Sequence, residues 1–420
     1  MIDLPSRMLA ALILAVAPGA DEPRSVVVEV EAGRHDRVDT PIILPAPGPI
    51  RDVPDLSLER LDNHQAVPVQ ATAIGSPSVS WIIREPLTAG ATRRYRLSAA
   101  SAPSAQAPLQ FSGGTSDLAL DLAGRPILTY HVAVAEPPPG IDGVFRRSGF
   151  VHPLATRSGL VVTDDFPPDH AHQHGLFFAW VNTTFEGRHV DFWNQKSKTG
   201  RVSHDEAAYR PTRHAGPVMA EFSVPLRHDD LTAPGGPAKV LDETWVVRAY
   251  DVPGLVVLDI ESTQTCAGPS PLILNKYHYG GLGLRGNRAW LDPTATGEGA
   301  PDPAKSGHSD FLTSEGKRRS DGNHTRPRWV DLSGEVGRRT AGVAILGHPA
   351  NFRFPQPVRL HPNMPYFCFA PMVLGEFTIE PGKPYVSRYR IVVHDGPPDS
   401  RLLNRLWDDY AEPPQVRVVP

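Results

Sequence analysis

Proline and glycine constrain the fold of this chain more than any other feature of its sequence. The 420 residues include 45 prolines and 36 glycines, and proline makes up about 11 % of the chain where about 5 % is average. Because both residues are costly inside helices, they argue against a helical bundle. The two together stay below the roughly 25–30 % of disordered chains, and 40 % of the residues are hydrophobic. We therefore predict a folded protein of short elements separated by turns.

Alternating apolar and β-branched segments between these turns predict strands. Early examples are residues 25–30, 41–44, 65–72, 81–83 and 94–97, and longer ones are residues 126–134, 243–250, 255–262, 341–346 and 385–394. Residues 242–262 have the pattern of a hairpin that turns at residues 251–254. Residues 398–410 carry apolar side chains on one helical face, with Asp399 or Ser400 as the cap.

The resulting prediction is an all-β protein. A large antiparallel β-sandwich follows a small β-domain, and a short helix closes the chain. The predicted boundaries are a signal peptide at residues 1–20, the small β-domain at 21–100 and a linker at 101–108. The main sandwich is expected at residues 109–396, and the C-terminal helix and tail at 397–420.

The N-terminus has the pattern of a secretory signal. Arg7 precedes an apolar run at residues 8–17, and small residues follow up to Ala20. Such a run is too short to span a bilayer, although a buried strand or an uncleaved anchor would give the same pattern. No other segment approaches about 18 consecutive apolar residues. We expect an exported protein, periplasmic or extracellular, with no membrane span after signal removal.

The net charge and the cysteine content limit which ligands and cross-links the chain is expected to have. The net charge is −4 and no long basic run occurs, which argues against nucleic acid as a partner. The two cysteines, Cys266 and Cys368, are far apart in sequence. A disulfide is allowed in an exported protein, and two buried thiols are the alternative. Without a CxxC pair, a cysteine-rich zinc site is not expected.

The most unusual segment is residues 161–180, which contain His170, His172 and His174 at alternate positions. On an extended strand these side chains would share one face. Asp165 and Asp169 lie just upstream. Histidines beside carboxylates can supply acid–base chemistry or bind a metal. We take His170 and His172 as candidate catalytic residues and Asp165 as a candidate substrate ligand.

Two further segments could contribute to a site. In residues 275–285, His278 stands between two tyrosines and is followed by closely spaced glycines and Arg285. His278 is a candidate catalytic residue and Arg285 a candidate substrate ligand, although a bulged strand with packed aromatics would look the same. In Asp191-Phe-Trp-Asn194, an aromatic pair lies between an acid and an amide, as in sugar-binding sites.

We therefore predict Asp191, Trp193 and Asn194 as substrate ligands, while noting that Phe192 and Trp193 could equally be core residues. His361, Glu376 and Asp321 are expected at the surface. Several known frameworks are missing: the sequence has no G-x-S-x-G elbow, no HExxH and no evident carboxylate pair of the glycosidase type.

These segments resemble a bacterial family. The chain has Arg147-Ser-Gly-Phe-Val-His-Pro-Leu154, then Asp164-Asp-Phe-Pro167, then Asp169-His-Ala-His-Gln-His-Gly-Leu-Phe-Phe-Ala-Trp180. This pattern is similar to the DUF6807 family, often labelled "methane oxygenase PmoA", and the resemblance covers roughly residues 110–396. Membrane methane oxygenase subunits have transmembrane helices, which this sequence lacks. The family has His-Arg where this chain has Gln173-His174, so the resemblance extends to His170 and His172 but not to His174.

Two looser resemblances concern the fold. The N-terminal part, with Val67-Pro-Val-Gln70, Trp81 and Arg94-Tyr-Arg-Leu97, is similar to the small β-domain of some rhamnogalacturonan lyases. The larger part resembles galactose-mutarotase-like supersandwiches, which include epimerases, lyases and hydrolases, so the resemblance leaves the reaction open.

The functional hypothesis is a carbohydrate-active enzyme that cleaves or modifies glycosides by histidine acid–base chemistry, lyase-like or hydrolase-like. The alternatives are a non-catalytic carbohydrate-binding module and a metalloprotein built on the histidine cluster. The hypothesis requires no cofactor, and a divalent metal at the histidines stays open.

Overall fold

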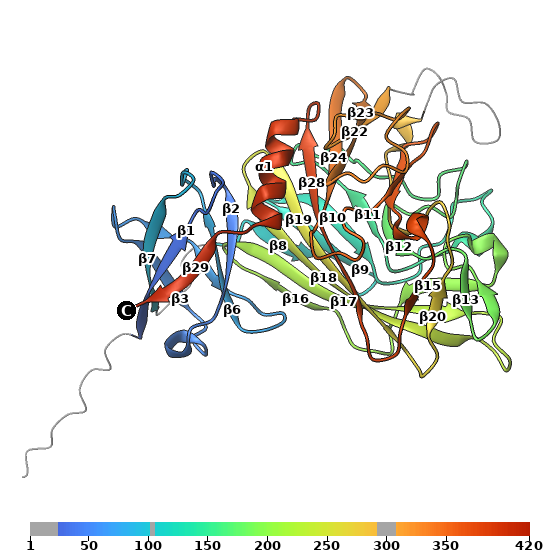
Figure 1. Cartoon of the computed structure of the whole chain (residues 1–420), viewed down its shortest axis with the longest axis horizontal. Helices are drawn as coiled ribbons and strands as arrows, with labels where there is room; N and C mark the ends of the chain where they lie inside the picture. The colour runs from blue at the N-terminus through green and yellow to red at the C-terminus, as the bar shows by residue number, and fades with distance from the viewer. Residues whose placement is uncertain (1–23, 101–105, 292–307) are drawn as a thin grey trace, which may run out of the picture.

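The computed structural model describes residues 24–100, 106–291 and 308–420, and antiparallel strands dominate it, as predicted (Figure 1). The predicted signal peptide at residues 1–20 lies outside the described residues, as does most of the predicted linker at residues 101–108. Both stay predictions.

Two small sheets are formed mainly by the N-terminal strands. One has the order β29-β1-β7-β3-β4 and the other β2-β6-β5. Their strands are β1 (Ser25–Glu31), β2 (Thr40–Pro45), β3 (Leu56–Arg60), β4 (Ala66–Val67), β5 (Val69–Ala71), β6 (Ser78–Ile83), β7 (Thr92–Ala99) and β29 (Gln415–Val419). They enclose a separate hydrophobic core, in which the ring centroids of Trp81 and Tyr95 lie 5.7 Å apart. The last strand of the chain therefore completes the first sheet, so the predicted tail is an ordered strand.

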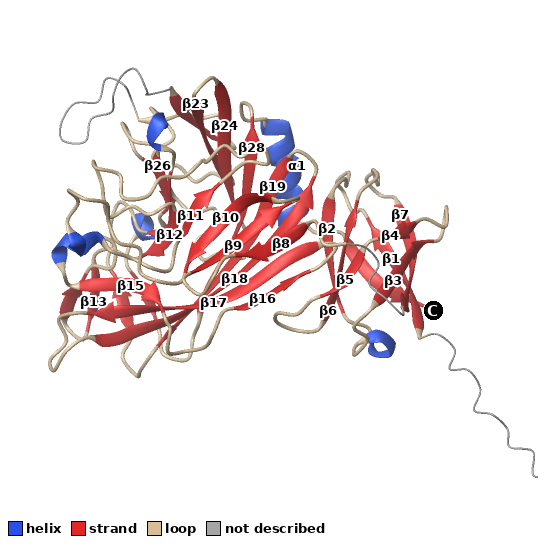
Figure 2. Cartoon of the chain, turned by 180° about the vertical axis from the view of Figure 1, so that it is seen from behind, coloured by secondary structure: helices blue, strands red, loops and turns tan. Residues whose placement is uncertain are grey.

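A nine-stranded sheet forms one layer of the larger part, where its long strands lie side by side (Figure 2). Its order is β15-β17-β18-β19-β28-β24-β23-β22, and β16 pairs with β17. The strands are β15 (Gly200–His204), β16 (Thr212–Ala215), β17 (Met219–Asp230), β18 (Ala238–Val252), β19 (Leu255–Cys266), β22 (Ser309–Thr313), β23 (Trp329–Val336), β24 (Arg339–Gly347) and β28 (Tyr385–Asp395). The predicted hairpin is confirmed, because Val252 pairs with Leu255 across the turn between β18 and β19.

An eight-stranded sheet carries the candidate site. Its order is β25-β26-β21-β12-β11-β10-β9-β8. The strands are β8 (Leu109–Ser112), β9 (Asp117–Leu122), β10 (Arg125–His131), β11 (Val151–Leu154), β12 (Leu176–Ala179), β21 (Gly281–Arg285), β25 (Val358–Leu360) and β26 (Tyr366–Phe369). Side chains of this sheet and of the nine-stranded sheet belong to one large hydrophobic core.

Shorter elements surround the two large sheets. A four-stranded sheet has the order β14-β13-β20-β27. Its strands are β13 (Thr183–Phe185), β14 (Arg188–Val190), β20 (Leu272–Leu274) and β27 (Phe377–Ile379). The 3-10 turns are η1 (Gly48–Ile50), η2 (Gly143–Phe145), η3 (Gln195–Ser197), η4 (Arg288–Trp290) and η5 (Pro371–Leu374).

The predicted C-terminal helix is α1 (Ser400–Ala411), and Asp399 is its cap because its carboxylate accepts the N–H groups of Arg401 and Leu402. Leu403 and Leu406 are buried in a core shared with strands of the nine-stranded sheet. No helix in the described part of the chain is long and apolar enough to cross a membrane.

The two cysteines do not form a disulfide. Cys266 is partly buried at the end of β19, Cys368 is buried in β26, and both thiols are free. Burial raises the pKa of the Cys368 thiol to about 11. The structure therefore has two separate thiols and not the disulfide that the sequence also allowed.

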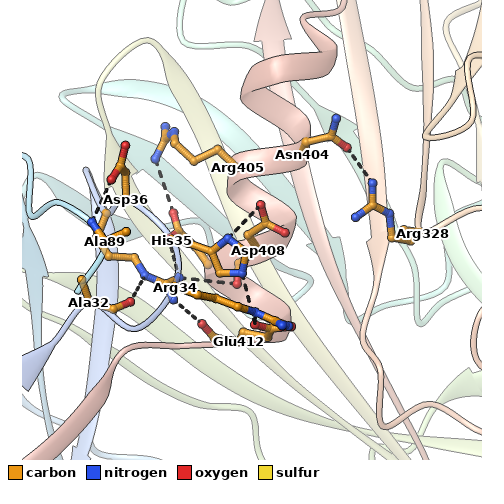
Figure 3. A network of polar contacts seen from close by, with 12 residues as sticks. Ala32, Arg34, His35, Asp36, Ala89, Arg328, Asn404, Arg405, Asp408 and Glu412 are labelled. Carbon is orange, nitrogen blue, oxygen red and sulfur yellow. Dashed lines mark hydrogen bonds and ion pairs between the residues drawn. The ribbon is translucent and has the colours of Figure 1, made fainter.

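Polar contacts attach α1 to the N-terminal strands. Arg34 and His35 both reach Glu412 just beyond the helix, in the network of Figure 3. Deeper in the same interface, Arg37 Nη1 donates to Asp409 Oδ1 at 2.9 Å, and these two side chains are 2 % and 1 % exposed. The buried ion pair therefore links α1, near the C-terminus, to the segment between β1 and β2.

Replacing Arg37 with Met should strongly destabilise the protein. The substitution leaves the Asp409 carboxylate buried without its main partner, and removing one member of a buried pair costs about 3–5 kcal/mol. Chemical unfolding measures the loss. Arg34→Met is the control: its side chain is 73 % exposed, so its unfolding midpoint should stay close to that of the parent. Equal midpoints for the two variants would contradict the importance of the buried pair.

Candidate functional site

A hollow of 230 Å³ lies against one face of the eight-stranded sheet, at strand β25. A row of directly paired residues crosses the sheet there: Phe177 in β12, Gly283 in β21, Cys368 in β26 and Arg359 in β25. Side chains of such pairs point to the same face. The hollow, called the histidine pocket below, is lined by His170, His172, Gln173, Trp193, Asn194, His278, Tyr279, Arg359, His361, Met364 and Tyr366.

The candidate catalytic residues His170, His172 and His278 all line this pocket. The first two come from the loop before β12 and the third from the connection between β20 and β21. The rings of His170 and His172 have centroids 5.5 Å apart. His278 is exposed at the rim, with its ring 4.7 Å from that of Tyr279. The structure thus brings the three imidazoles together, while their catalytic role stays a prediction.

The histidine segment is not the extended strand that its alternate spacing predicts. Two consecutive turns replace it: the N–H of His170 donates to Pro167 O at 3.0 Å, and that of Gln173 to His170 O at 2.9 Å. Two successive prolines supply no N–H groups for a sheet ladder, which favours a loop at this point. The turns place His170 and His172 at the pocket and direct His174 elsewhere.

His174 belongs to the interior. Its side chain is fully buried, its Nδ1 lies 2.6 Å from Asp165 Oδ1, and its Nε2 lies 3.2 Å from Gln195 Oε1. Burial lowers the pKa of His174, although the Asp165 carboxylate opposes that shift. Asp165, predicted to bind substrate, does not line the pocket and instead holds this buried imidazole.

A buried ion pair lies behind His170. Nδ1 of His170 is 3.4 Å from Asp169 Oδ2, and both Nη atoms of Arg285 donate to Asp169, at 2.8 and 2.9 Å. Burial by itself would raise the pKa of Asp169, but His170 and Arg285 bring it below its ordinary range. Arg285 is fully buried and also contacts Gln173. Arg285, predicted to bind substrate, therefore does not line the pocket but fixes the residues that do.

The segment 191–194 forms another wall of the pocket. Asp191 accepts hydrogen bonds from the backbone N–H groups of Trp193 and Asn194, at 2.9 and 2.8 Å, so its carboxylate stabilises a turn. Asp191, predicted to bind substrate, is absent from the pocket lining. Asn194 does line it, and its Nδ2 donates to Tyr279 Oη at 2.9 Å. Trp193 and Asn194 therefore line the pocket and Asp191 does not, while the binding roles of all three stay predictions.

Trp193 lies over Gly283. A Cβ atom at Gly283 would be 2.7 Å from Trp193 Cη2 and 3.3 Å from Phe177 Cζ. The indole is 1 % exposed, and its ring centroid lies 5.4 Å from that of Tyr279 and 5.8 Å from that of Tyr366. Trp193 is thus a core residue that also forms a wall of the pocket, and its role as a substrate ligand stays a prediction.

Two further residues line the pocket: Arg359 in β25, and His361 in the connection between β25 and β26. A surface position was predicted for His361, but its ring centroid lies 6.1 Å from that of His170. Nδ1 of His361 accepts the backbone N–H groups of Asn363 and Met364, each at 3.2 Å. In the neutral ring the proton is therefore on Nε2. No motif surrounds these residues in the sequence, and strand pairing alone brings them to the site.

Three of the pocket imidazoles, those of His172, His278 and His361, have a lowered pKa and so favour the neutral form. Burial, aided by the charge of nearby groups, lowers the pKa of His172 to about 3 and that of His361 to about 3. Burial and the Arg359 guanidinium also lower the pKa of His278. Neutral imidazoles near pH 7 are suited to accepting or relaying protons.

The arrangement gives no support to a metal site. Among the residues that the structure describes, no group of three or more His, Cys, Asp or Glu side chains is placed to hold a metal ion. The proposal below therefore includes no metal.

The fold and the pocket define an all-β chain with a histidine-lined site on a large sandwich. A family model for DUF6807, a family of unknown function, matches residues 117–408. The match spans more than half of the chain and includes His170, His172, His278 and His361. The chain belongs to the DUF6807 family, as its motifs indicate.

Other comparisons add little. No curated protein matches the chain. A solved structure titled as a protein in glycosyl hydrolase family 38 from Enterococcus faecalis aligns with a TM-score of 0.46 at 10 % identity. The alignment covers 96 % of this chain and 48 % of the other, so the chain spans about half the length of that protein.

Replacing Gly283 with Ala should disturb the pocket. The new methyl group would meet the Trp193 ring, and overpacking of this kind costs about 1–3 kcal/mol. Chemical unfolding followed by tryptophan fluorescence measures the effect. Gly268→Ala is the matched control, because nothing lies within 4 Å of a Cβ there, and it should be close to neutral. Equal stability of both variants would show that Trp193 is free to move.

Replacing His172 with Asn should alter the acid stability of the protein. The folded-state pKa is about 3 and the ordinary value 6.5, so the unfolded chain binds an extra proton between these pH values. The parent should therefore lose stability as pH falls from 6.5 towards 3, by at most about 1.4 kcal/mol per pH unit from this residue. In His172→Asn the free energy of unfolding should therefore depend less steeply on pH than in the parent. His361→Asn should show the same reduction. Unfolding curves that stay parallel to the parent's over this range would refute a buried neutral imidazole.

Proposed function

We propose that this chain is an exported carbohydrate-active enzyme that transfers protons to and from a saccharide unit bound in the histidine pocket, in a lyase-like reaction. One observation carries the proposal: imidazoles from three separate segments, around residues 170, 278 and 361, line one hollow. Isolated histidines are common on protein surfaces, but several gathered in one concave site suit acid–base catalysis.

Aromatic rings and an amide support a sugar as the ligand. Trp193, Tyr279 and Tyr366 line the pocket together with Asn194. Rings can cover the apolar face of a sugar, while amide and imidazole groups bond its hydroxyls. The volume of 230 Å³ is below the ~300–1,000 Å³ of sites for drug-sized ligands. A single sugar unit, alone or within a chain, therefore suits it better than a large ligand.

The environment of His170 supports a role as general base. Arg285 holds Asp169, and Asp169 lies beside Nδ1 of His170. Nδ1 of His170 makes no hydrogen bond with a described residue, but the negative charge of Asp169 at 3.4 Å favours a proton on Nδ1 and a lone pair on Nε2, the arrangement of a general base. His361 has its proton on Nε2 and can therefore donate a hydrogen bond to the substrate. The pocket thus offers one imidazole oriented as a proton acceptor and another oriented as a hydrogen-bond donor.

The lack of acids favours a lyase-like over a hydrolase-like reaction. Glycoside hydrolysis usually needs two carboxyl groups flanking the bond, and none of the residues lining the pocket is Asp or Glu. Asp169 is the nearest acid to His170, and it is committed to Arg285. Proton abstraction followed by elimination needs a base and then an acid, and one imidazole can serve as both, because the imidazolium formed by abstraction can protonate the leaving oxygen.

Replacing His170 with Ala should lower turnover by about 100- to 10,000-fold, the usual contribution of a general acid or base. The assay is a screen of oligosaccharides with product detection by chromatography and mass spectrometry, and His172→Ala should also abolish most of the turnover. His189→Ala, an exposed residue of β14 outside the pocket, is the control and should retain it. Thermal unfolding checks that each variant is folded.

Each other outcome points to a different function. Unchanged turnover in folded His170→Ala and His172→Ala would overturn the catalytic proposal. A glycan that raises the melting temperature without yielding product would indicate a binding module. Stoichiometric zinc, copper or iron in the purified protein would favour the metalloprotein alternative.

A further inference from the structure

Arg359 lines two neighbouring hollows at once. One is the histidine pocket, and the other, of 470 Å³, is also lined by Asp310, Arg318 and Pro362. The two hollows adjoin at residues 359–362, because Arg359 lines both, His361 lines the histidine pocket and Pro362 lines the larger hollow. A ligand longer than one sugar unit could therefore occupy both and meet Arg359 between them.

The guanidinium of Arg359 has no hydrogen bond or ion pair with any described residue. Nearby arginines differ in this respect. Arg285 is paired with Asp169, and Arg319 donates to the carbonyl oxygen of Met364 at 2.8 Å. A partly buried guanidinium offers five donors in a planar fork, so an unused one beside a candidate site suits an anionic ligand.

No other charge in the lining of the histidine pocket compensates that of Arg359. None of its lining residues is an acid, and the pKa values of His172, His278 and His361 are lowered, which favours their neutral forms. The charge of Arg359 itself favours neutral imidazoles. It is the second cause, after burial, of the lowered pKa of His278 and of His361. The pocket thus presents one positive charge among neutral polar and aromatic groups.

We infer that the bound saccharide unit carries a carboxylate, as a uronic acid does, and that Arg359 binds this group. The inference rests on the proposed function of the same pocket. A carboxylate matches the guanidinium fork in a bidentate ion pair. The larger hollow accepts the adjoining unit of the acidic chain near Arg318, whose acid neighbour Asp310 lies 3.7 Å away. The substrate class is therefore a uronate-containing oligosaccharide.

This substrate suits the lyase-like chemistry. Pairing the carboxylate with Arg359 withdraws charge from it and makes the proton on the adjacent ring carbon more acidic. An imidazole takes that proton, and the electron pair forms a double bond to the next carbon. The glycosidic bond from that carbon to oxygen breaks, and the leaving oxygen takes up the proton that the first imidazole, now an imidazolium, returns. Atoms and charge balance without an oxidant, a reductant or a cofactor.

The test compares matched ligands and matched variants. Calorimetry measures binding of galacturonate and glucuronate oligosaccharides and of their carboxyl-reduced counterparts to the full chain. An oligosaccharide that carries sulfate groups and no carboxylate is the third probe. Ultraviolet absorbance of the conjugated unsaturated uronate detects elimination. Arg359→Gln should weaken binding of the uronate probe by about 10- to 100-fold, the value of a hydrogen bond to a charged group. Arg401→Gln, an exposed residue on α1 that lines neither hollow, should bind as the parent does.

The outcomes separate this inference from the proposed function. Equal binding of uronate and carboxyl-reduced probes, stronger binding of the sulfated probe, or unchanged binding by Arg359→Gln would overturn the choice of a carboxylate. If a neutral probe is turned over at the same time, the proposed enzyme function stands. If no probe is bound or converted, both are overturned.

Discussion

The histidine pocket depends on the buried ion pair between Asp169 and Arg285. Arg285 is on β21, near the middle of the eight-stranded sheet, and Asp169 is in a loop with no strand of its own. A fully buried guanidinium without its carboxylate would be strongly unfavourable. The pair therefore fixes the loop against the sheet and sets the position of His170 and, through Gln173, of the residues that follow it.

The sheet supplies the rest of the site through its register. Residues of β12, β21, β26 and β25 stand opposite one another in one row, from Phe177 to Arg359. Because the row includes Gly283, Trp193 can lie directly over the strand. A shift of one residue in the pairing of β25 and β26 would move Arg359 and Tyr366 to the opposite face of the sheet. The same pairing that holds the sandwich together therefore assembles the pocket.

Much of this fold could be predicted from the sequence, because its signals are local. Alternation gave the long strands, Pro253 and Gly254 marked the turn of the β18–β19 hairpin, and apolar periodicity gave α1. The pairing of β29 with β1 could not be predicted, because it joins the two ends of the chain and leaves no local pattern. The site shows the same division. His170 and His172 stand in a recognisable motif, whereas His361 and Arg359 reach the pocket only through strand pairing.

The charged residues predicted to bind substrate lie outside the lining of the pocket. Asp165, Asp191 and Arg285 were expected to face a ligand, and each instead satisfies a buried partner: His174, the turn at Trp193, and Asp169. Because an unpaired buried charge is costly, charged side chains near a core pair with other groups of the protein and are not available to a ligand. Arg359 differs because it stands on an edge strand at the mouth of two hollows, where solvent reaches it. A charge left unpaired there costs the fold little and stays available to a ligand of opposite sign.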